Sequence, residues 1–173
     1  MRPSPESSPE TSQSLTGPTE ISFDVRCFVL PVADGILVID TGMGDNATAM
    51  HQALERLGAD WADISDVLIT HAHADHVGGL NEVLSKAGNA LVWAGEADAG
   101  AVSAGISSGP ETSEPQVRAT ADGASIRGLR VIHTPGHTQG HIGLLHEGEG
   151  PLVTPQNPVL PWCRDSRRRQ PAS

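Results

Sequence analysis

The sequence predicts an α/β fold in a single domain, and three observations along its 173 residues support this prediction. Two β-rich runs flank an Asp34-Gly35 turn, and a short apolar run of the buried-strand type covers residues 66–70. Helical patterns follow both features. Strands that alternate with helices are typical of an α/β arrangement.

The first elements follow from local pattern. The two β-rich runs lie within residues 21–42, and the Asp-Gly pair between them predicts a hairpin. Apolar residues then recur at helical spacing from Ala49 to Leu57, and Gly58 follows where a helix C-cap falls. One amphipathic helix is therefore expected between the hairpin and the buried-type strand.

The middle of the chain continues the alternation. A His-rich segment follows the strand at 66–70, and a helical stretch covers about residues 77–86. A short strand (90–93) and a helix of small residues (about 96–104) come next. The segment 105–115 is rich in Gly, Ser and Pro and is expected to be the most mobile.

The last predicted elements are strands. Residues 125–136 predict one strand, and residues 141–147 and 151–154 predict a further pair around a turn at 148–150.

The chain divides into three parts. Residues 1–20 are rich in Ser, Pro, Thr and Glu and predict a disordered tail. The domain itself is expected over residues 21–154, and residues 155–173 predict an irregular tail without strand or helix pattern.

Composition narrows the classes of function. The formal net charge of −10 makes nucleic acid and anionic membranes poor partners, because both are negatively charged. No run approaches the roughly 20 apolar residues of a membrane-spanning helix, and the amino-terminal segment lacks the apolar core of a secretory signal, so a cytoplasmic location is expected. Tyr is absent, which excludes a phenolic proton donor. Because there are eight His and only two Cys, a bound metal would be held by imidazole and carboxylate groups.

The most informative segment is THAHADHVGG, which follows a strand and contains His71, His73, Asp75 and His76. A spacing of two puts His71 and His73 on the same side of an extended chain, so that two imidazoles converge on one point. Asp75 and His76 are adjacent and are expected to diverge, facing a second point a few ångströms away. The pattern therefore suggests two metal positions.

A third ligand is needed for the first position. Catalytic zinc usually takes three protein ligands and leaves the fourth position to water. His137 is the best candidate, because it follows a tight Pro135-Gly136 turn at the end of a strand. Two alternatives stay open: a polar loop with incidental His residues for the first segment, and a turn cap for His137.

These motifs resemble those of the metallo-β-lactamase superfamily of metallo-hydrolases. Three segments match in order and context, namely ILVIDTG with Asp40, HxHxDH at 71–76, and TPGHTxGH around His137. The resemblance covers roughly residues 21–154. It implies a four-layer α/β/β/α sandwich of two similar halves, with the metals at one edge between the sheets.

The resemblance also implies roles for individual residues. It assigns the ligands of a first zinc ion, which are His71, His73 and His137, and those of a second, which are Asp75 and His76. Asp40 would orient the metal loop, and His141 would lie near the site. For Asp40, the roles of a helix N-cap or a turn residue stay open as alternatives.

The implied function is that of a zinc-dependent hydrolase. Hydroxide formed at the metal would attack an ester, thioester, lactone or amide carbonyl of a small-molecule substrate. In this scheme Asp75 is the catalytic residue, which orients the hydroxide or accepts its proton.

The match to the family pattern ends at about residue 154, so the domain is expected to be truncated or altered there. Pro155-Gln156 stands where the family has a Gly-Asp whose Asp bridges both metals, and no His follows His146. The second half of the sandwich is therefore expected to be incomplete, as a frameshift would produce.

An incomplete second half would affect metal binding, activity and self-association. One zinc site is expected to be tight and the second weaker or absent. The alternative function is a catalytically impaired or inactive metal-binding remnant of the family. Uncovered sheet surface would also favour self-association.

Overall fold

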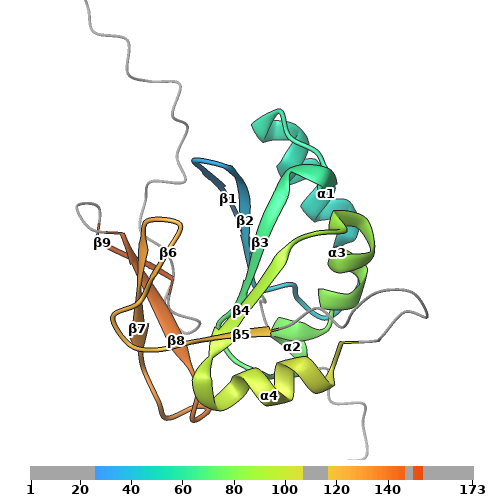
Figure 1. Cartoon of the computed structure of the whole chain (residues 1–173). Coiled ribbons are helices and arrows are strands. Elements are labelled where there is room, and N and C mark those ends of the chain that lie inside the picture. The colour runs from blue at the N-terminus through green and yellow to red at the C-terminus, as the bar shows by residue number, and fades with distance from the viewer. Residues whose placement is uncertain (1–25, 107–116, 147–149, 154–173) are drawn as a thin grey trace, which may run out of the picture.

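The computed structural model describes residues 26–106, 117–146 and 150–153. Two sheets face each other, and helices cover the outer face of the larger one (Figure 1). The larger sheet has the strand order β1-β2-β3-β4-β5 and the smaller one the order β6-β7-β8-β9. The predicted tails, the segment 107–116 and the predicted change of pattern after residue 154 lie outside the described residues.

A hairpin forms one edge of the larger sheet. β1 (Phe28–Val32) pairs antiparallel with β2 (Gly35–Ile39), which confirms the predicted hairpin. Val32 faces Gly35 in the ladder, so the turn is Ala33-Asp34, one residue earlier than predicted. Gly35 has a φ of 141°, a backbone conformation that L side chains rarely adopt, so glycine is required there.

The other strands of this sheet run parallel to β2 and are joined by helices. They are β3 (Ile64–Ile69), β4 (Leu91–Gly95) and β5 (Val117–Thr120). The connecting helices are α1 (Ala47–Leu57), the 3₁₀ turn η1 (Trp61–Asp63), α2 (Ala74–Val77), α3 (Leu80–Ala87) and α4 (Glu96–Ala104). The carboxyl ends of the four parallel strands therefore meet at one edge of the sheet.

The helix predicted over residues 77–86 corresponds to α3, which begins later, at Leu80, because Val77 ends the short helix α2 and Gly78-Gly79 separate the two. A Cβ on Gly79 would collide with the carbonyl oxygen of Thr41. The loop after β2 thus packs directly on these glycines, and this close approach is the physical reason for two glycines between the helices.

The smaller sheet is an antiparallel meander. Its strands are β6 (Ser125–Ile126), β7 (Leu129–His133), β8 (Ile142–His146) and β9 (Gly150–Val153). The prediction of one strand over 125–136 is wrong, because Arg127 and Gly128 take positive φ values of 52° and 84° and reverse the chain. The β8–β9 pair confirms the predicted strands, whereas β5 lies where no element was predicted.

Side chains of the larger sheet alternate between two cores. Ile36 and Val38 of β2 pack under the helices, whereas Leu37 and Ile39 pack against the smaller sheet. Each of the two faces therefore buries its own apolar cluster, as expected for parallel strands covered on both sides.

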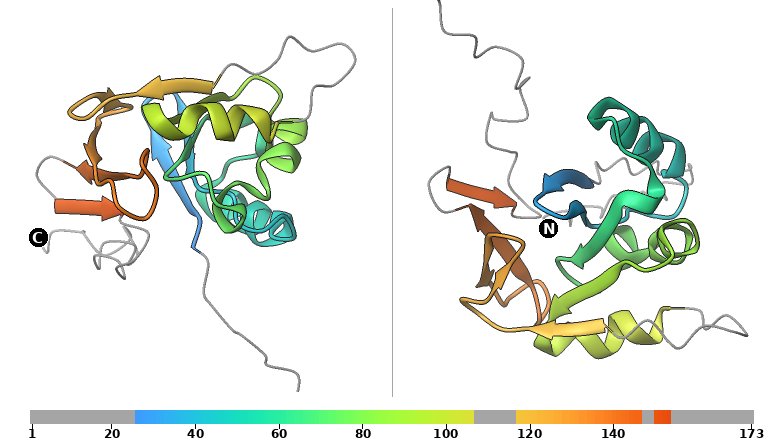
Figure 2. Two further views of the ribbon diagram at one scale, coloured as in Figure 1. Left: turned by 90° about the horizontal axis from the view of Figure 1, so that it is seen from below. Right: turned by 45° about the horizontal axis from the view of Figure 1, so that its top comes forward.

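The observed layers are helices, sheet and sheet (Figure 2). The α/β class is confirmed. No helix of the described residues covers the outer face of the smaller sheet, so the described part contains three of the four layers that the resemblance implies. Within that part, no helix is long and apolar enough to cross a membrane.

Candidate metal centre

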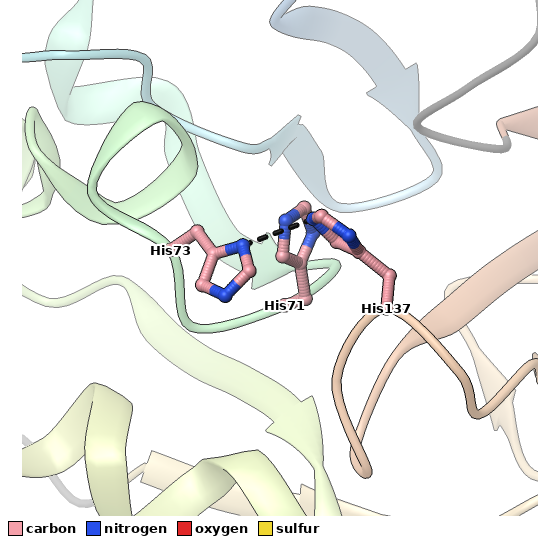
Figure 3. Close-up of side chains that lie close together, drawn as sticks. All are labelled: His71, His73 and His137. Carbon is pink, nitrogen blue, oxygen red and sulfur yellow. Dashed lines mark hydrogen bonds between the residues drawn. The ribbon is translucent and has the colours of Figure 1, made fainter.

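The candidate centre lies where the carboxyl ends of β2 and β3 meet the loop between β7 and β8. Asp40 directly follows β2, and His71 comes two residues after β3. His73 is the N-cap of α2, which contains Asp75 and His76. His137 comes from the β7–β8 loop of the other sheet, so the two sheets together build the site (Figure 3).

Three imidazoles converge at this place. One nitrogen from each of His71, His73 and His137 lies within 4.8 Å of the others, and Nδ1 of His73 is 2.9 Å from Nε2 of His137 (Figure 3). A tetrahedral zinc ion with bonds of about 2.0–2.1 Å holds its nitrogen ligands about 3.3 Å apart, so the cluster has the size of one such ion. His71 is buried whereas the other two are exposed, which leaves one side of the cluster open to solvent.

Thr70 and Asp40 orient the ring of His71. Thr70 Oγ1 donates to Oδ2 of Asp40 at 2.7 Å, and its lone pairs face Nδ1 of His71 at 3.2 Å. Nδ1 is therefore the protonated nitrogen, and the lone pair of His71 lies on Nε2. That Nε2 is buried without a hydrogen-bond partner among the described residues.

The charge state of His71 suits a metal ligand. Burial, followed by the nearby imidazoles of His76, His141, His137 and His73, lowers the pKa of His71 from 6.5 to about 3. The ring is thus neutral at pH 7, which is the form that binds a cation. A buried nitrogen with a free lone pair costs free energy unless something binds it, so these residues fit a metal ion.

A second candidate group shares His71 with Asp75 and His76, and its ligand atoms also lie within 4.8 Å of one another. Oδ2 of Asp75 is 3.4 Å from Nε2 of His76, so the two side chains face one second point, as predicted, but they do not diverge from each other. Both lie in the short helix α2 rather than in extended chain, so the alternation of a strand does not apply to them.

Asp40 is the buried anchor of this arrangement. Its carboxylate accepts hydrogen bonds from the backbone N–H of Thr70, from the Thr70 hydroxyl and from Nδ1 of His76 at 2.8 Å. Burial opposes protonation of His76, but its hydrogen bond to Asp40 and the charges of Asp40 and Asp75 outweigh it and raise the pKa. The N-cap of α1 is Asn46, which excludes the N-cap alternative for Asp40.

His141 lies beside the cluster, as the resemblance implies. Its ring is 5.1 Å from that of His71, and its Nδ1 is 2.6 Å from the Thr134 hydroxyl. Its Nε2 is buried without a partner among the described residues. Burial, and then the neighbouring His137, lower the pKa of His141. His141 belongs to neither group of three ligand atoms.

Two further residues build the site and were not predicted from the sequence, namely Thr70 and Asp98. From the sequence, Thr70 is expected at the end of a strand, and Asp98 is expected within a helix of small residues. Burial opposes ionisation of Asp98, but hydrogen bonds from Thr138, Ala72 and Gly140 outweigh it and lower the pKa below 3.8. Glu96 and Asp98 both stand in the first turn of this helix, so the sequence offers no signal that singles out Asp98.

Comparisons with known proteins identify the family of the chain. The family model of the metallo-beta-lactamase superfamily matches residues 23–154. A hydroxyacylglutathione hydrolase of Synechococcus sp. (strain JA-3-3Ab) is 31% identical over 61% of this chain and 39% of its own length. The lactamase-like protein aptB of Emericella nidulans is 32% identical over 70% of this chain and 36% of its own length.

Solved structures show the same likeness. The class B3 di-zinc metallo-beta-lactamase LRA-12 from an Alaskan soil metagenome is 30% identical, with a TM-score of 0.60 over 70% of this chain and 50% of that one. The chain thus spans about half or less of the length of these three similar proteins. The family model covers well over half of this chain, and the chain therefore belongs to the metallo-β-lactamase superfamily.

Proposed function

We propose that this chain is a metal-dependent hydrolase with zinc as its metal. The observation that supports this most directly is the cluster of His71, His73 and His137, in which a buried neutral imidazole meets two exposed ones. His71, His73 and His137 would hold the first ion. Asp75 and His76 would contribute to a second, next to the first.

A zinc ion held by these three imidazoles would keep its full charge and would supply activated water at neutral pH, because zinc lowers the pKa of bound water from 15.7 toward about 7. The chain's own residues do the rest. Asp40 and Thr70 keep the lone pair of His71 on Nε2, and Asp75, half-buried beside His76, would accept a proton at its carboxylate. The exposed side of the cluster admits the substrate.

The proposed substrates are small molecules with an ester, thioester, lactone or amide carbonyl. Hydrolysis at such a carbonyl needs no protein nucleophile when activated water is available. Within this range a hydroxyacylglutathione thioester is the first compound to test, because similar proteins are named hydroxyacylglutathione hydrolases.

The test is zinc binding together with turnover. The full chain, loaded with zinc, is assayed against a hydroxyacylglutathione thioester, a nitrophenyl ester, a lactone and a β-lactam. We expect hydrolysis of at least one compound, and loss of more than 99% of it in His71→Ala and His137→Ala. His51→Ala is the matched control, because His51 lies on α1 outside the cluster.

The number of bound ions is a separate expectation of the same proposal. Asp75 and His76 share His71 with the first group, and no other described carboxylate joins them in a group of candidate ligand atoms, since Asp40 bonds only to the Nδ1 side of His76. We therefore expect one equivalent of zinc to survive dialysis. Two equivalents retained after dialysis would contradict this, and zinc binding without any turnover would favour the metal-binding remnant instead.

A further inference from the structure

The two loops that supply the three imidazoles belong to different sheets. His71 and His73 follow β3 of the larger sheet, whereas His137 lies between β7 and β8 of the smaller one. Zinc tolerates only small errors in ligand position, so something must hold the two loops in fixed relation. A backbone hydrogen bond from Ile142 to Thr70 (3.0 Å) joins the strands behind them.

Asp98 joins the loops themselves. Its Oδ2 accepts a hydrogen bond from the backbone N–H of Ala72 at 3.1 Å and one from the Thr138 hydroxyl at 2.6 Å. Its Oδ1 accepts one from the backbone N–H of Gly140 at 2.9 Å. Ala72 lies between the first two imidazoles in sequence, and Thr138 directly follows His137. One carboxylate, 6% exposed, thus contacts the immediate neighbours of all three proposed ligands.

Two glycines hold the His137 loop tightly against the start of α4. A Cβ on Gly140 would lie 2.6 Å from Cγ of Asp98, and a Cβ on Gly95 would collide with the carbonyl oxygen of Gly140. Because the backbone approaches so closely, the three hydrogen bonds of Asp98 have little room to lengthen.

We propose that Asp98 is a positioning residue for the first metal position, which holds His137 in place relative to His71 and His73 and so sets the affinity for zinc. Asp98 is not itself a ligand, because it belongs to neither group of ligand atoms in the described residues. The inference rests on the proposed zinc function. Residues that orient the ligands of a metal typically contribute 10–100-fold to its affinity.

Asp66 provides a matched control for general destabilisation. It is also a fully buried carboxylate that joins the two sheets, since it accepts hydrogen bonds from Nε1 of Trp93 (2.8 Å) and Nε of Arg127 (2.7 Å). It lies five residues before His71, roughly 16 Å along the strand. Its loss should weaken the fold without touching the metal loops.

The experiment measures the zinc dissociation constant of the full chain by chelator competition, the visible spectrum of the cobalt-substituted chain, and the melting temperature of the metal-free chain. Asp98→Asn should weaken zinc binding about 10- to 100-fold and alter the cobalt spectrum. Asp66→Asn should lower the melting temperature while changing the dissociation constant less than about twofold.

If Asp98→Asn does not fold, two milder substitutions of Thr138 still test the proposal. Thr138→Ser retains the hydroxyl and should keep the affinity of the wild type, whereas Thr138→Val should lose part of it. The double variant Asp98→Asn/His137→Ala should bind no more weakly than His137→Ala alone, because Asp98 acts through that ligand.

Equal zinc affinity in the wild type, Asp98→Asn and Thr138→Val would overturn the positioning role. Additive losses in the double variant would overturn it too. A wild-type chain that binds no zinc would overturn the proposed function and, with it, this inference; the two failures are therefore distinguishable.

Discussion

Asp40 holds more of the site together than any ligand does. It is 1% exposed, it has a φ of 57°, and its carboxylate connects the end of β3 to the ring of His76. Asp and Asn are the non-glycine residues that best tolerate this left-handed conformation, because their short polar side chains bond locally. A residue at position 40 must adopt this left-handed backbone conformation, and its side chain must accept three hydrogen bonds.

We predict that Asp40→Asn lowers the free energy of unfolding of the metal-free chain by roughly 1–3 kcal/mol. The NH2 group that replaces one carboxylate oxygen cannot accept hydrogen bonds, so at least one buried donor on Thr70 or His76 loses its partner. Urea denaturation measures the change, and Asp45→Asn in the exposed part of the same loop is the control. An equal effect of both substitutions would contradict the prediction.

A second prediction at this scale concerns pH and Asp98. Its pKa in the folded chain lies below 3.8, so its contribution to stability is fully present above pH 3.8 and is lost as the pH falls through the folded value. The difference in unfolding free energy between the metal-free wild type and Asp98→Asn should be constant at pH 5–7 and narrow below pH 3.8. Urea curves at several pH values measure it, and a gap that widens in acid would be the contrary result.

At the scale of elements, α4 contains two glycines with opposite roles. Gly95 is the N-cap, and a Cβ there would collide with the carbonyl oxygen of Gly140, whereas a Cβ on Gly100 meets nothing within 4 Å. Gly95 is therefore needed for the close contact between α4 and the His137 loop, whereas Gly100 is not.

We predict that Gly95→Ala lowers the melting temperature and weakens zinc binding, because the His137 loop must move to make room. Gly100→Ala should be neutral or stabilising by up to about 1 kcal/mol, since alanine is the better helix former. Thermal unfolding followed by circular dichroism compares the two variants. Equal melting temperatures would show that the loop is not held tightly on α4.

For the whole molecule, the proposed metal connects the two sheets. A ligand that binds only the folded state stabilises it by about 2.7 kcal/mol at a concentration 100 times its dissociation constant. We predict that zinc raises the melting temperature of the wild type and of His51→Ala, and raises that of His137→Ala much less, because this substitution removes the ligand from the smaller sheet and weakens binding. Calorimetry with and without zinc measures this, and an equal shift in His137→Ala would mean that zinc binds elsewhere.

Self-association through uncovered sheet surface stays a prediction at this scale.

The sequence by itself determined the α/β class, the first hairpin, α1 with its Gly58 cap, and the His-rich segment with its distant partner His137, because each depends on local periodicity, turn residues or motif spacing. It did not reveal the break at Gly78-Gly79 or the reversal at Arg127-Gly128, where backbone contacts and positive φ values override the local pattern. Only the tertiary structure decided that Thr70 and Asp98 belong to the site. The partners of Asp98 lie 26 to 42 residues away in sequence, and no local pattern encodes which distant backbone groups a buried carboxylate will meet.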